Sequence, residues 1–112
     1  MIEYRFYKVG DTAPPLDYQA TSPEGHPIDC RPYTSAFFSL RRKDCPTKKL
    51  THVAATIVDA QSGHLRYQWV AGDLSEQGQY YGEFDLEGAD GNRTVPGEWY
   101  LEIDVKPELP EV

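Results

Sequence analysis

Turn-forming residues divide this chain at short, even intervals, and no other feature constrains its fold as strongly. Nine glycines and nine prolines fall mostly in turn signals, which lie about 8–12 residues apart. The signals are Gly10-Asp11, Pro14-Pro15, Ser22-Pro23-Glu24-Gly25, Asp44-Cys45-Pro46, Ser62-Gly63, Ala71-Gly72-Asp73, Gln77-Gly78, Asp90-Gly91-Asn92 and Pro96-Gly97. No window between them has the apolar period of a core helix, and the spacing is typical of an all-β sandwich or barrel.

The segments between the turns alternate apolar and polar side chains, which is the period of a half-buried strand. The predicted apolar faces are Ile2, Tyr4 and Phe6; Ala36, Phe38 and Leu40; Val53, Ala55 and Ile57; Leu65, Tyr67 and Trp69; Tyr80, Gly82, Phe84 and Leu86; and Trp99, Leu101, Ile103 and Val105. Shorter pieces near 16–20 and 27–29 bring the total to seven or eight strands. One wet face per strand indicates antiparallel sheets packed face to face.

One local pattern favours an immunoglobulin-like sandwich. The stretch from Asp73 to Tyr80 enters a predicted strand, with Gly78 two residues before the tyrosine. Immunoglobulin-like domains often place a tyrosine at the start of their sixth strand, where its hydroxyl bonds to backbone a few residues upstream. Tyr80 is expected to fill this role. Trp69 and Trp99 are candidates for the central packing aromatic.

The predicted fold is therefore all-β, an immunoglobulin-like antiparallel β-sandwich of seven to eight strands in one domain over residues 1–112. A chain of this length buries about two thirds of its unfolded surface, which is enough for a core of its own. We expect residues 1–9 to form an N-terminal strand. Residues 107–112 are expected to fray, because two prolines interrupt a strand ladder there.

Charge and hydropathy exclude some partners. Eleven basic and 18 acidic residues give a net charge of −7, which argues against nucleic-acid binding. The basic run 41–43 with Lys48 and Lys49 is expected to be a solvated loop. No apolar stretch approaches the ~20 residues of a membrane span, and the N-terminus lacks the order of a signal peptide. We expect no nucleic-acid or membrane partner, and assembly in a cytoplasm.

Few residues suggest chemistry. Cys30 and Cys45 form no CxxC pair, and His26, His52 and His64 are scattered, so no zinc site is expected. Both cysteines are expected to be free thiols in a reducing compartment, while a disulfide between them stays open. Cys30 beside His26 or His52 is imaginable as a nucleophile, but a small buried hydrophobe is the alternative. We expect no catalytic site, no cofactor and no metal.

The acidic stretch 85–92 superficially resembles a calcium loop. Ala89 and Pro96 stand where an EF-hand loop starting at Asp85 needs ligands. A hairpin turn at Asp90-Gly91 is the better interpretation, because Asp-Gly readily takes positive φ.

The eight tyrosines carry more information. Tyr4, Tyr67 and Tyr80 have the parity of the predicted core, whereas Tyr7, Tyr81 and Tyr100 have the opposite parity and should face outward. Exposed tyrosines are enriched in protein interfaces, so these three are interface candidates. The alternative is that they cover a sheet face within the monomer or lie under a loop.

Several motifs in consistent order resemble the N-terminal domain of tailed-phage baseplate upper proteins. They are Gly10-Asp-Thr-Ala-Pro-Pro-Leu16, Pro23-Glu-Gly-His-Pro-Ile-Asp29, Ala55-Thr-Ile-Val-Asp59, Gly63-His-Leu-Arg-Tyr-Gln-Trp69, the block from Ala71 to Phe84, and Asp90-Gly91 with Thr94-Val-Pro96 and Tyr100-Leu101. The resemblance covers about residues 10–106. Two parts have no counterpart in it: the first segment, and the basic, cysteine-containing stretch 41–49.

This resemblance implies an immunoglobulin-like module of a phage virion. Such a module would be non-enzymatic and would help to assemble a tail, baseplate or neck, in the virion after assembly in the bacterial cytoplasm. Its partners would be further copies of itself and other virion proteins. The first segment, 1–9, is a further contact candidate. The alternative is a carbohydrate-binding β-sandwich, in which Tyr7, Tyr81 and Tyr100 form a sugar platform if their strands adjoin.

Overall fold

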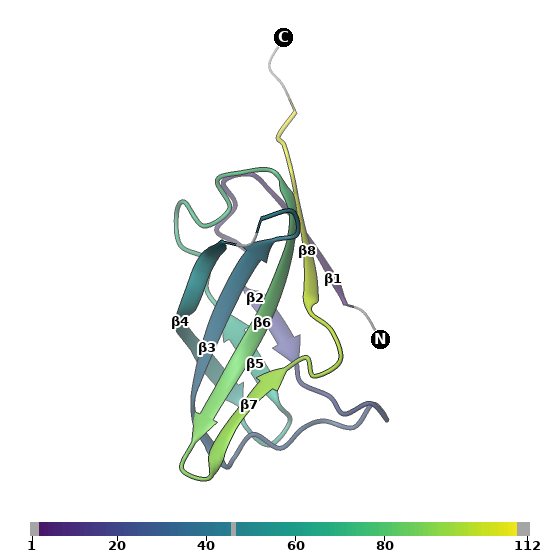
Figure 1. The fold of residues 1–112 in the computed structure, drawn as a ribbon, viewed down its shortest axis with the longest axis vertical. Coiled ribbons are helices and arrows are strands. Elements are labelled where there is room, and N and C mark those ends of the chain that lie inside the picture. Colours follow the sequence, from purple (N-terminus) through teal and green to yellow (C-terminus); the bar gives the residue numbers. More distant parts are fainter. Residues whose placement is uncertain (1–2, 46, 110–112) are drawn as a thin grey trace.

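The computed structural model describes residues 3–45 and 47–109, and this part of the chain holds eight strands and no helix (Figure 1). The strands are β1 (Tyr4–Lys8), β2 (Leu16–Gln19), β3 (Tyr33–Arg42), β4 (Lys48–Asp59), β5 (His64–Tyr67), β6 (Gly78–Gly88), β7 (Gly91–Val95) and β8 (Leu101–Lys106). Within these ranges, nothing has the helical length and apolar character that a membrane crossing by a helix requires.

The strands form one curled sheet in the order β1-β8-β6-β3-β4-β5-β2, and β7 pairs with β6. The sheet curls at β4, which pairs with β3 up to Ala55 and with β5 from Thr56 onward. We call the layer of β1, β8, β6, β7, β3 and the first half of β4 sheet A. The second half of β4, β5 and β2 form sheet B. The predicted all-β sandwich of seven to eight strands is confirmed.

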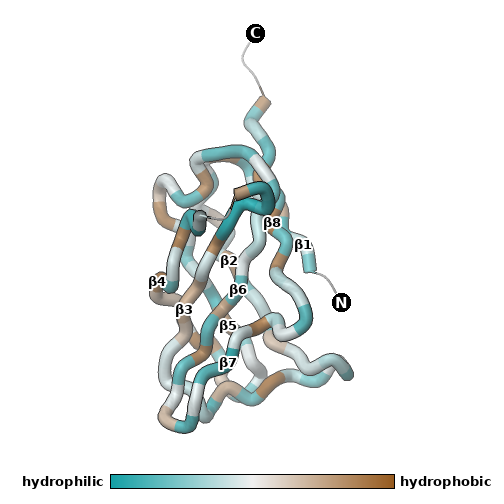
Figure 2. The backbone as a smooth tube through the Cα atoms, viewed as in Figure 1, coloured by the Kyte–Doolittle hydropathy of each residue, from teal (hydrophilic) through white to brown (hydrophobic). Residues whose placement is uncertain are grey.

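The core lies between the two layers. β6 alternates as predicted, with Tyr80, Phe84 and Leu86 fully buried and their neighbours outward. Figure 2 shows the same interleaving of hydrophobic and hydrophilic residues along the strands. The predicted hairpin is present, but its turn lies one residue earlier than predicted. Gly88 pairs with Gly91, so the two turn residues are Ala89 and Asp90, and Gly91 starts β7. Among residues 3–45 and 47–109, 20 buried apolar side chains form one contiguous cluster, as a sandwich core requires.

Two predictions about β1 are wrong. β1 pairs with β8 in parallel, so the sheets are not purely antiparallel. Its burial parity is also reversed, since Tyr4 and Phe6 are 56% and 69% exposed while Tyr7 is only 6% exposed. The inward side of this edge strand holds Arg5, which donates to the Asp17 carbonyl of β2 at 2.9 Å. Ile2, predicted on the same apolar face, lies outside the described residues.

The prediction that Trp99 packs centrally is also wrong, because it is 44% exposed. The predicted last strand does not run through this position. The chain leaves the ladder after β7, which ends at Val95, and returns at Leu101 in β8. Only Leu101, Ile103 and Val105 of the predicted face reach the core.

Two smaller segments differ from expectation or fall partly outside the described residues. Residues 27–29 form no strand, and only an isolated bridge joins Pro27 to Thr21. Of the predicted frayed tail, residues 107–109 follow β8 without strand structure, and residues 110–112 lie outside the described part.

Candidate interaction surface

Two of the three tyrosines predicted to face outward lie together on the outer face of sheet A. The rings of Tyr81 and Tyr100 are 4.8 Å apart between centroids. Trp99 joins them, at 5.8 Å from Tyr81 and 5.4 Å from Tyr100. We call these three residues the aromatic cluster. Tyr7, the third predicted interface residue, is buried and packs edge-on against Trp69 at 5.3 Å, so its assignment to an exposed interface is wrong.

Two different local structures build this cluster. Tyr81 is an outward residue of β6, in register with Arg41 on β3 and Glu102 on β8. Trp99 and Tyr100 come from the segment between β7 and β8 that has left the ladder. Tyr81 faces outward because of the alternation along β6. Trp99 and Tyr100 reach the same face because the chain is not in a strand between β7 and β8.

Charged side chains flank the aromatic cluster. The Arg41 guanidinium lies 5.5 Å from the centre of the Tyr81 ring, and Lys43 Nζ lies 5.1 Å from it, both within cation–π range. Glu102 accepts hydrogen bonds from Lys43 and, at 2.9 Å, from Trp99 Nε1. The bond from Lys43, and secondarily that from Trp99, lowers the pKa of Glu102. The hydrogen bond to Glu102 therefore holds the Trp99 indole in place although the ring is partly exposed to solvent.

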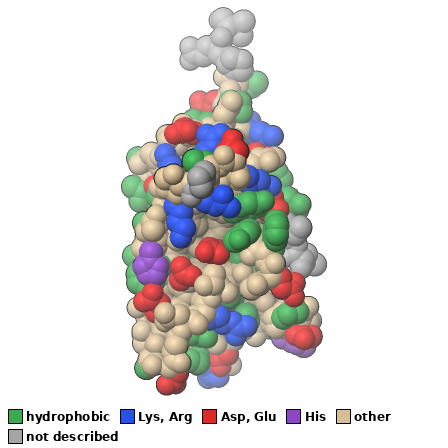
Figure 3. All heavy atoms as spheres, viewed as in Figure 1, with side chains coloured by type: hydrophobic (Ala, Val, Ile, Leu, Met, Phe, Trp, Pro, Cys, Tyr) green, Lys and Arg blue, Asp and Glu red, His purple; other side chains and the backbone are tan. Residues whose placement is uncertain are grey.

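The apolar surface continues onto the edge strand. Tyr4 is in register with Glu102 and Phe6 with Asp104, so both aromatic side chains border the same face. Figure 3 shows hydrophobic side chains gathered on this face next to Lys and Arg side chains. β1 pairs only with β8, so its other backbone edge has no strand partner among the described residues.

Farther along β6, the outer face becomes acidic. Glu83, Asp85 and Glu87 alternate outward on this strand, and we call them the acidic ladder. Burial raises the pKa of Glu83, and the nearby Asp85 charge adds to that effect. His52 lies beside the ladder, with Nε2 3.0 Å from a Glu87 oxygen and Nδ1 3.6 Å from an Asp85 oxygen.

His52 holds its position through an irregularity in β4. Its φ is +53°, a left-handed conformation that is uncommon for a residue with a Cβ. The pairing of β3 with β4 shifts register here, and the His52 backbone N–H donates to Ser39 Oγ at 3.0 Å. The imidazole stacks on the Phe37 ring at 4.0 Å. This bulge turns the histidine onto the outer face beside the acidic ladder.

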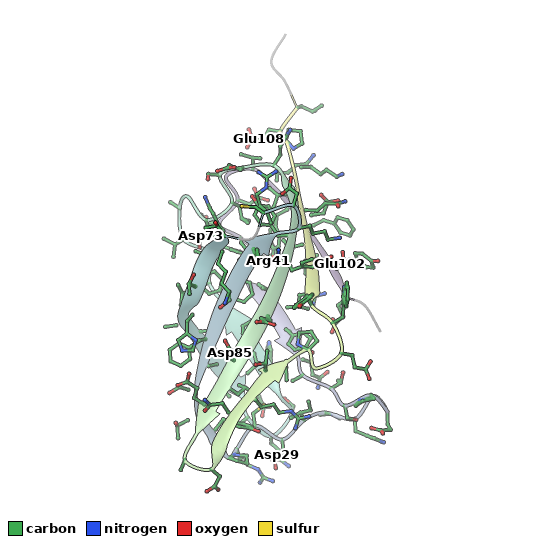
Figure 4. All side chains as sticks on the ribbon, in the orientation of Figure 1. Asp29, Arg41, Asp73, Asp85, Glu102 and Glu108 are labelled. Atoms are coloured by element: carbon green, nitrogen blue, oxygen red, sulfur yellow. The ribbon has the colours of Figure 1, made fainter. Side chains whose placement is uncertain are left out.

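A shallow hollow of about 40 Å³ lies between the aromatic cluster and Glu83 of the acidic ladder. The side chains that line it include Ser39, Arg41, Lys48, Tyr81, Glu83 and Tyr100. Figure 4 labels Arg41, Glu102 and Asp85 on this face, with Asp85 nearer the β6–β7 turn. The outer face therefore presents an aromatic and basic zone at one end and carboxylates at the other.

The residues predicted to be structural are mostly placed as expected. Tyr80 is fully buried, and its hydroxyl donates to the Glu76 carbonyl at 2.8 Å, the upstream bond predicted from the sequence. Asp73 is buried and accepts from the Tyr67 hydroxyl at 2.6 Å and the Val70 N–H at 2.9 Å. Burial, and then Asp73, raises the pKa of Tyr67. Gly78 starts β6 at φ +148°, where a Cβ would lie 3.2 Å from the Arg42 guanidinium.

Trp69 is the central packing aromatic. It is buried and meets the rings of Phe38 and Tyr67 nearly at right angles, at 5.8 and 5.2 Å. Cys30 is buried and Cys45 is partly exposed, and both are free thiols. Burial raises the pKa of the Cys30 thiol. In residues 3–45 and 47–109, no three His, Cys, Asp or Glu side chains are grouped to hold a metal ion.

The chain was compared with known proteins at three levels. No family model matches its sequence, no curated protein matches it, and no solved structure matches its fold. The resemblance to phage baseplate modules therefore stays a prediction.

Sequence reasoning missed three of the exposed aromatics: Tyr4, Phe6 and Trp99. A usable signal existed only for Trp99, because Pro96-Gly97 stands just before it and interrupts a ladder. For Tyr4 and Phe6, the apolar alternation pointed the wrong way. An edge strand can present its more apolar side outward when a neighbouring molecule covers it.

Proposed function

We propose that this protein is a non-enzymatic structural or assembly module of a tailed-phage particle, working in the tail, baseplate or neck. It acts through protein–protein contacts made by the outer face of sheet A. The phage assignment depends on the order of motifs that resemble baseplate upper proteins. The contact surface depends on the geometry, and one observation carries it: Tyr81, Trp99 and Tyr100 are in mutual contact on one exposed face.

Exposed aromatic residues in contact, bordered by charge, are a feature of interfaces. Scattered exposed apolar side chains are ordinary, but a contiguous patch rimmed by polar groups marks a binding surface. Aromatic residues and Arg are the types most enriched in interface cores. The aromatic cluster has Arg41 and Lys43 beside it and Tyr4 and Phe6 on the neighbouring strand.

Mass spectrometry of purified particles from the source host tests the phage assignment. We expect the chain at a fixed copy number relative to the major capsid protein. Its absence from particles would contradict the proposal. For the surface, the double variant Trp99→Ala with Tyr100→Ala should lower the copies incorporated at least about tenfold, as loss of hot-spot residues does. Val70→Ala removes an exposed apolar residue elsewhere and should leave incorporation unchanged.

A carbohydrate-binding module is the second candidate, since three aromatic rings do adjoin. Their arrangement favours it less. The planes of Tyr81 and Trp99 meet at 83°, those of Trp99 and Tyr100 at 53°, and those of Tyr81 and Tyr100 at 36°. The rings lean on one another and do not form a flat platform for a sugar. Saturable quenching of Trp99 fluorescence by host-wall polysaccharide, absent in Trp99→Phe, would favour this candidate.

A further inference from the structure

We propose that the outer face of sheet A binds a second copy of this chain, face to face, with the strands of the two copies running in opposite directions. In this dimer, the basic zone of each copy lies against the acidic ladder of the other. The inference rests on the proposed function, in which this face makes protein contacts. To the proposed function it adds that the partner is a second copy of this chain, and that opposite charges on the two faces determine how the copies pair.

The basic zone is Arg41, Lys43 and Lys48, next to the aromatic cluster. Arg41 and Lys48 are in register on β3 and β4. Neither forms an ion pair with a carboxylate of the described chain, whereas Lys43 is paired with Glu102. Two cations on this face therefore have unused capacity to pair with carboxylates of a neighbouring molecule.

The acidic ladder is a row of carboxylates that form no ion pair with a Lys or Arg of the described chain. Glu83, Asp85 and Glu87 stand two residues apart on one face of β6, so like charges lie about 7 Å from each other. His52 contacts Asp85 and Glu87. No described Lys or Arg lies within ion-pair distance of the ladder, although the Lys48 charge opposes the raised pKa of Glu83. Such an arrangement is costly in isolation and is relieved by cations on a partner.

The register of the strands makes the pattern self-complementary. Ser39 and Glu83 form a pair across β3 and β6. The Arg41–Tyr81 pair lies two residues to one side of it, and Asp85 with Phe37 lies two residues to the other. A twofold axis in the plane of the face, crossing the strands at the Ser39–Glu83 pair, lays each strand antiparallel over itself. Arg41 then lies over the partner copy's position 37 on β3 and about 4.8 Å, one strand spacing, from the ladder on β6, which is within reach of its long side chain. Such an isologous contact closes on itself.

The size of the face fits a stable dimer. β7 and β8 both pair with β6, along different stretches of it, so sheet A is five strand positions wide, or about 24 Å at a spacing of about 4.8 Å. The 11 residues of β6 extend about 36 Å. Only β3 and β6 run the full length, and the edge strand β1 has five residues. The face is therefore smaller than the product of about 860 Å², at roughly 700 Å², which lies within the range per partner of standard interfaces. The exposed aromatic cluster would supply the apolar part of this area, and the charges would set the direction of pairing.

Charge reversal with rescue tests the dimer. Light scattering after gel filtration of wild-type protein at about 100 μM should give twice the 12.7 kDa chain mass, since micromolar dimers are populated there. The variants Arg41→Glu with Lys48→Glu, and Asp85→Lys with Glu87→Lys, should each raise the dissociation constant at least about tenfold. Their equimolar mixture should form a heterodimer of about wild-type affinity, because both contacts again join opposite charges.

The controls separate this effect from misfolding. Circular dichroism and the thermal midpoint check each variant. The single substitutions Lys48→Glu, at an exposed residue, and Glu87→Lys, at a half-buried one, replace the doubles if these do not fold, and should follow the same rescue pattern. Glu24→Lys, in the loop before the Pro27 bridge, has the same change in charge away from this face and should not change dimerisation.

Two outcomes would overturn the inference. One is a wild-type chain that stays monomeric. The other is a dimer that both charge reversals leave intact, which would place the contact elsewhere. In either case the proposed function is judged separately. If Trp99→Ala with Tyr100→Ala still loses incorporation into particles, the face binds another protein. If the chain is absent from particles while dimerisation and rescue hold, the phage assignment fails and the dimer stands.

Discussion

Two groups of aromatic residues in this molecule have similar ring contacts and opposite surroundings. In the interior, Phe38 meets Tyr67 at 4.8 Å and Phe84 at 5.1 Å between centroids. On the outer face, the aromatic cluster has spacings of 4.8–5.8 Å. The first group is sealed between the layers, and the second is open to solvent beside Arg, Lys and Glu side chains. Ring geometry alone thus does not separate a core from a binding surface.

The two groups differ in how much their burial contributes to the free energy of folding. Burying an aromatic side chain removes a large apolar area from water, so the interior group contributes heavily to folding. The outer group forgoes that gain within the monomer. The outer group is held to the rest of the fold by polar contacts, such as the hydrogen bond from Trp99 Nε1 to Glu102. Interior substitutions should therefore change stability, and outer ones should change association.

The largest expected effect is that of Phe38→Ala. Phe38 is fully buried among Tyr67, Trp69 and Phe84, and removing such a ring leaves a cavity that costs about 3–5 kcal/mol. Denaturant titration should show this loss in the free energy of unfolding. Tyr81→Ala, on the outer face, should cost less than about 1 kcal/mol. Equal losses for the two variants would erase the distinction between the groups.

Asp73→Ala should come next, at about 2–3 kcal/mol. Its carboxylate is buried and accepts from both Tyr67 and the Val70 backbone. Removing it leaves the Tyr67 hydroxyl without that partner at the rim of the interior group. A double-mutant cycle with Tyr67→Phe, followed by denaturant titration, measures the pair. If the two single losses simply add, the hydrogen bond is not a source of stability.

Much of the interior could be predicted from the sequence, because each strand of a sandwich buries only its inner face, and this imposes a period of two. That period correctly placed Tyr80 and Phe84 on β6 and Tyr67 and Trp69 on or just after β5. The upstream bond of Tyr80 followed from a local motif. These features depend on residues close together in the sequence, so the alternation within one central strand is enough to predict which side chains are buried.

The outer surface was predicted less well, because its arrangement depends on events that alternation does not encode. β1 joins β8 in parallel, through residues almost a chain length apart, and its exposed side is the more apolar one. Trp99 is displaced by the break between β7 and β8. The sequence contains the acidic ladder and Arg41, but their register across β3 and β6 joins segments about 40 residues apart, which alternation within one strand does not encode.

A pH-dependent effect sharpens the comparison within the interior. Tyr18 is buried and stacks against Phe84, and burial raises its pKa from 10.0 to about 12. A raised tyrosine pKa stabilises the fold fully below pH 10, and this stabilisation is lost as the pH rises through 12. At pH 11, the loss from this group is about 1.4 kcal/mol. Tyr18→Phe should therefore lessen the alkaline decline by about that amount.

Denaturant titrations from pH 8 to pH 11 measure this effect. Tyr4→Phe, which removes an exposed hydroxyl, is the matched control. The free energy of unfolding could instead fall equally with pH in Tyr18→Phe and wild type. Burial would then not hold the Tyr18 hydroxyl in its neutral form, and water would reach the interior group.

The smallest change in stability is expected for Trp99→Ala. Its ring is 44% exposed, meets the rings of Tyr81 and Tyr100 and donates one hydrogen bond to Glu102, so the free energy of unfolding should fall by about 1 kcal/mol or less. The same variant should weaken self-association by about tenfold or more, because an aromatic anchor in an interface can carry more than 1 kcal/mol of binding. Thermal unfolding and sedimentation measure the two quantities in the same sample. A variant that loses stability in the manner of Phe38→Ala, yet associates normally, would place Trp99 with the interior group and remove the distinction on which the outer face is proposed as an interface.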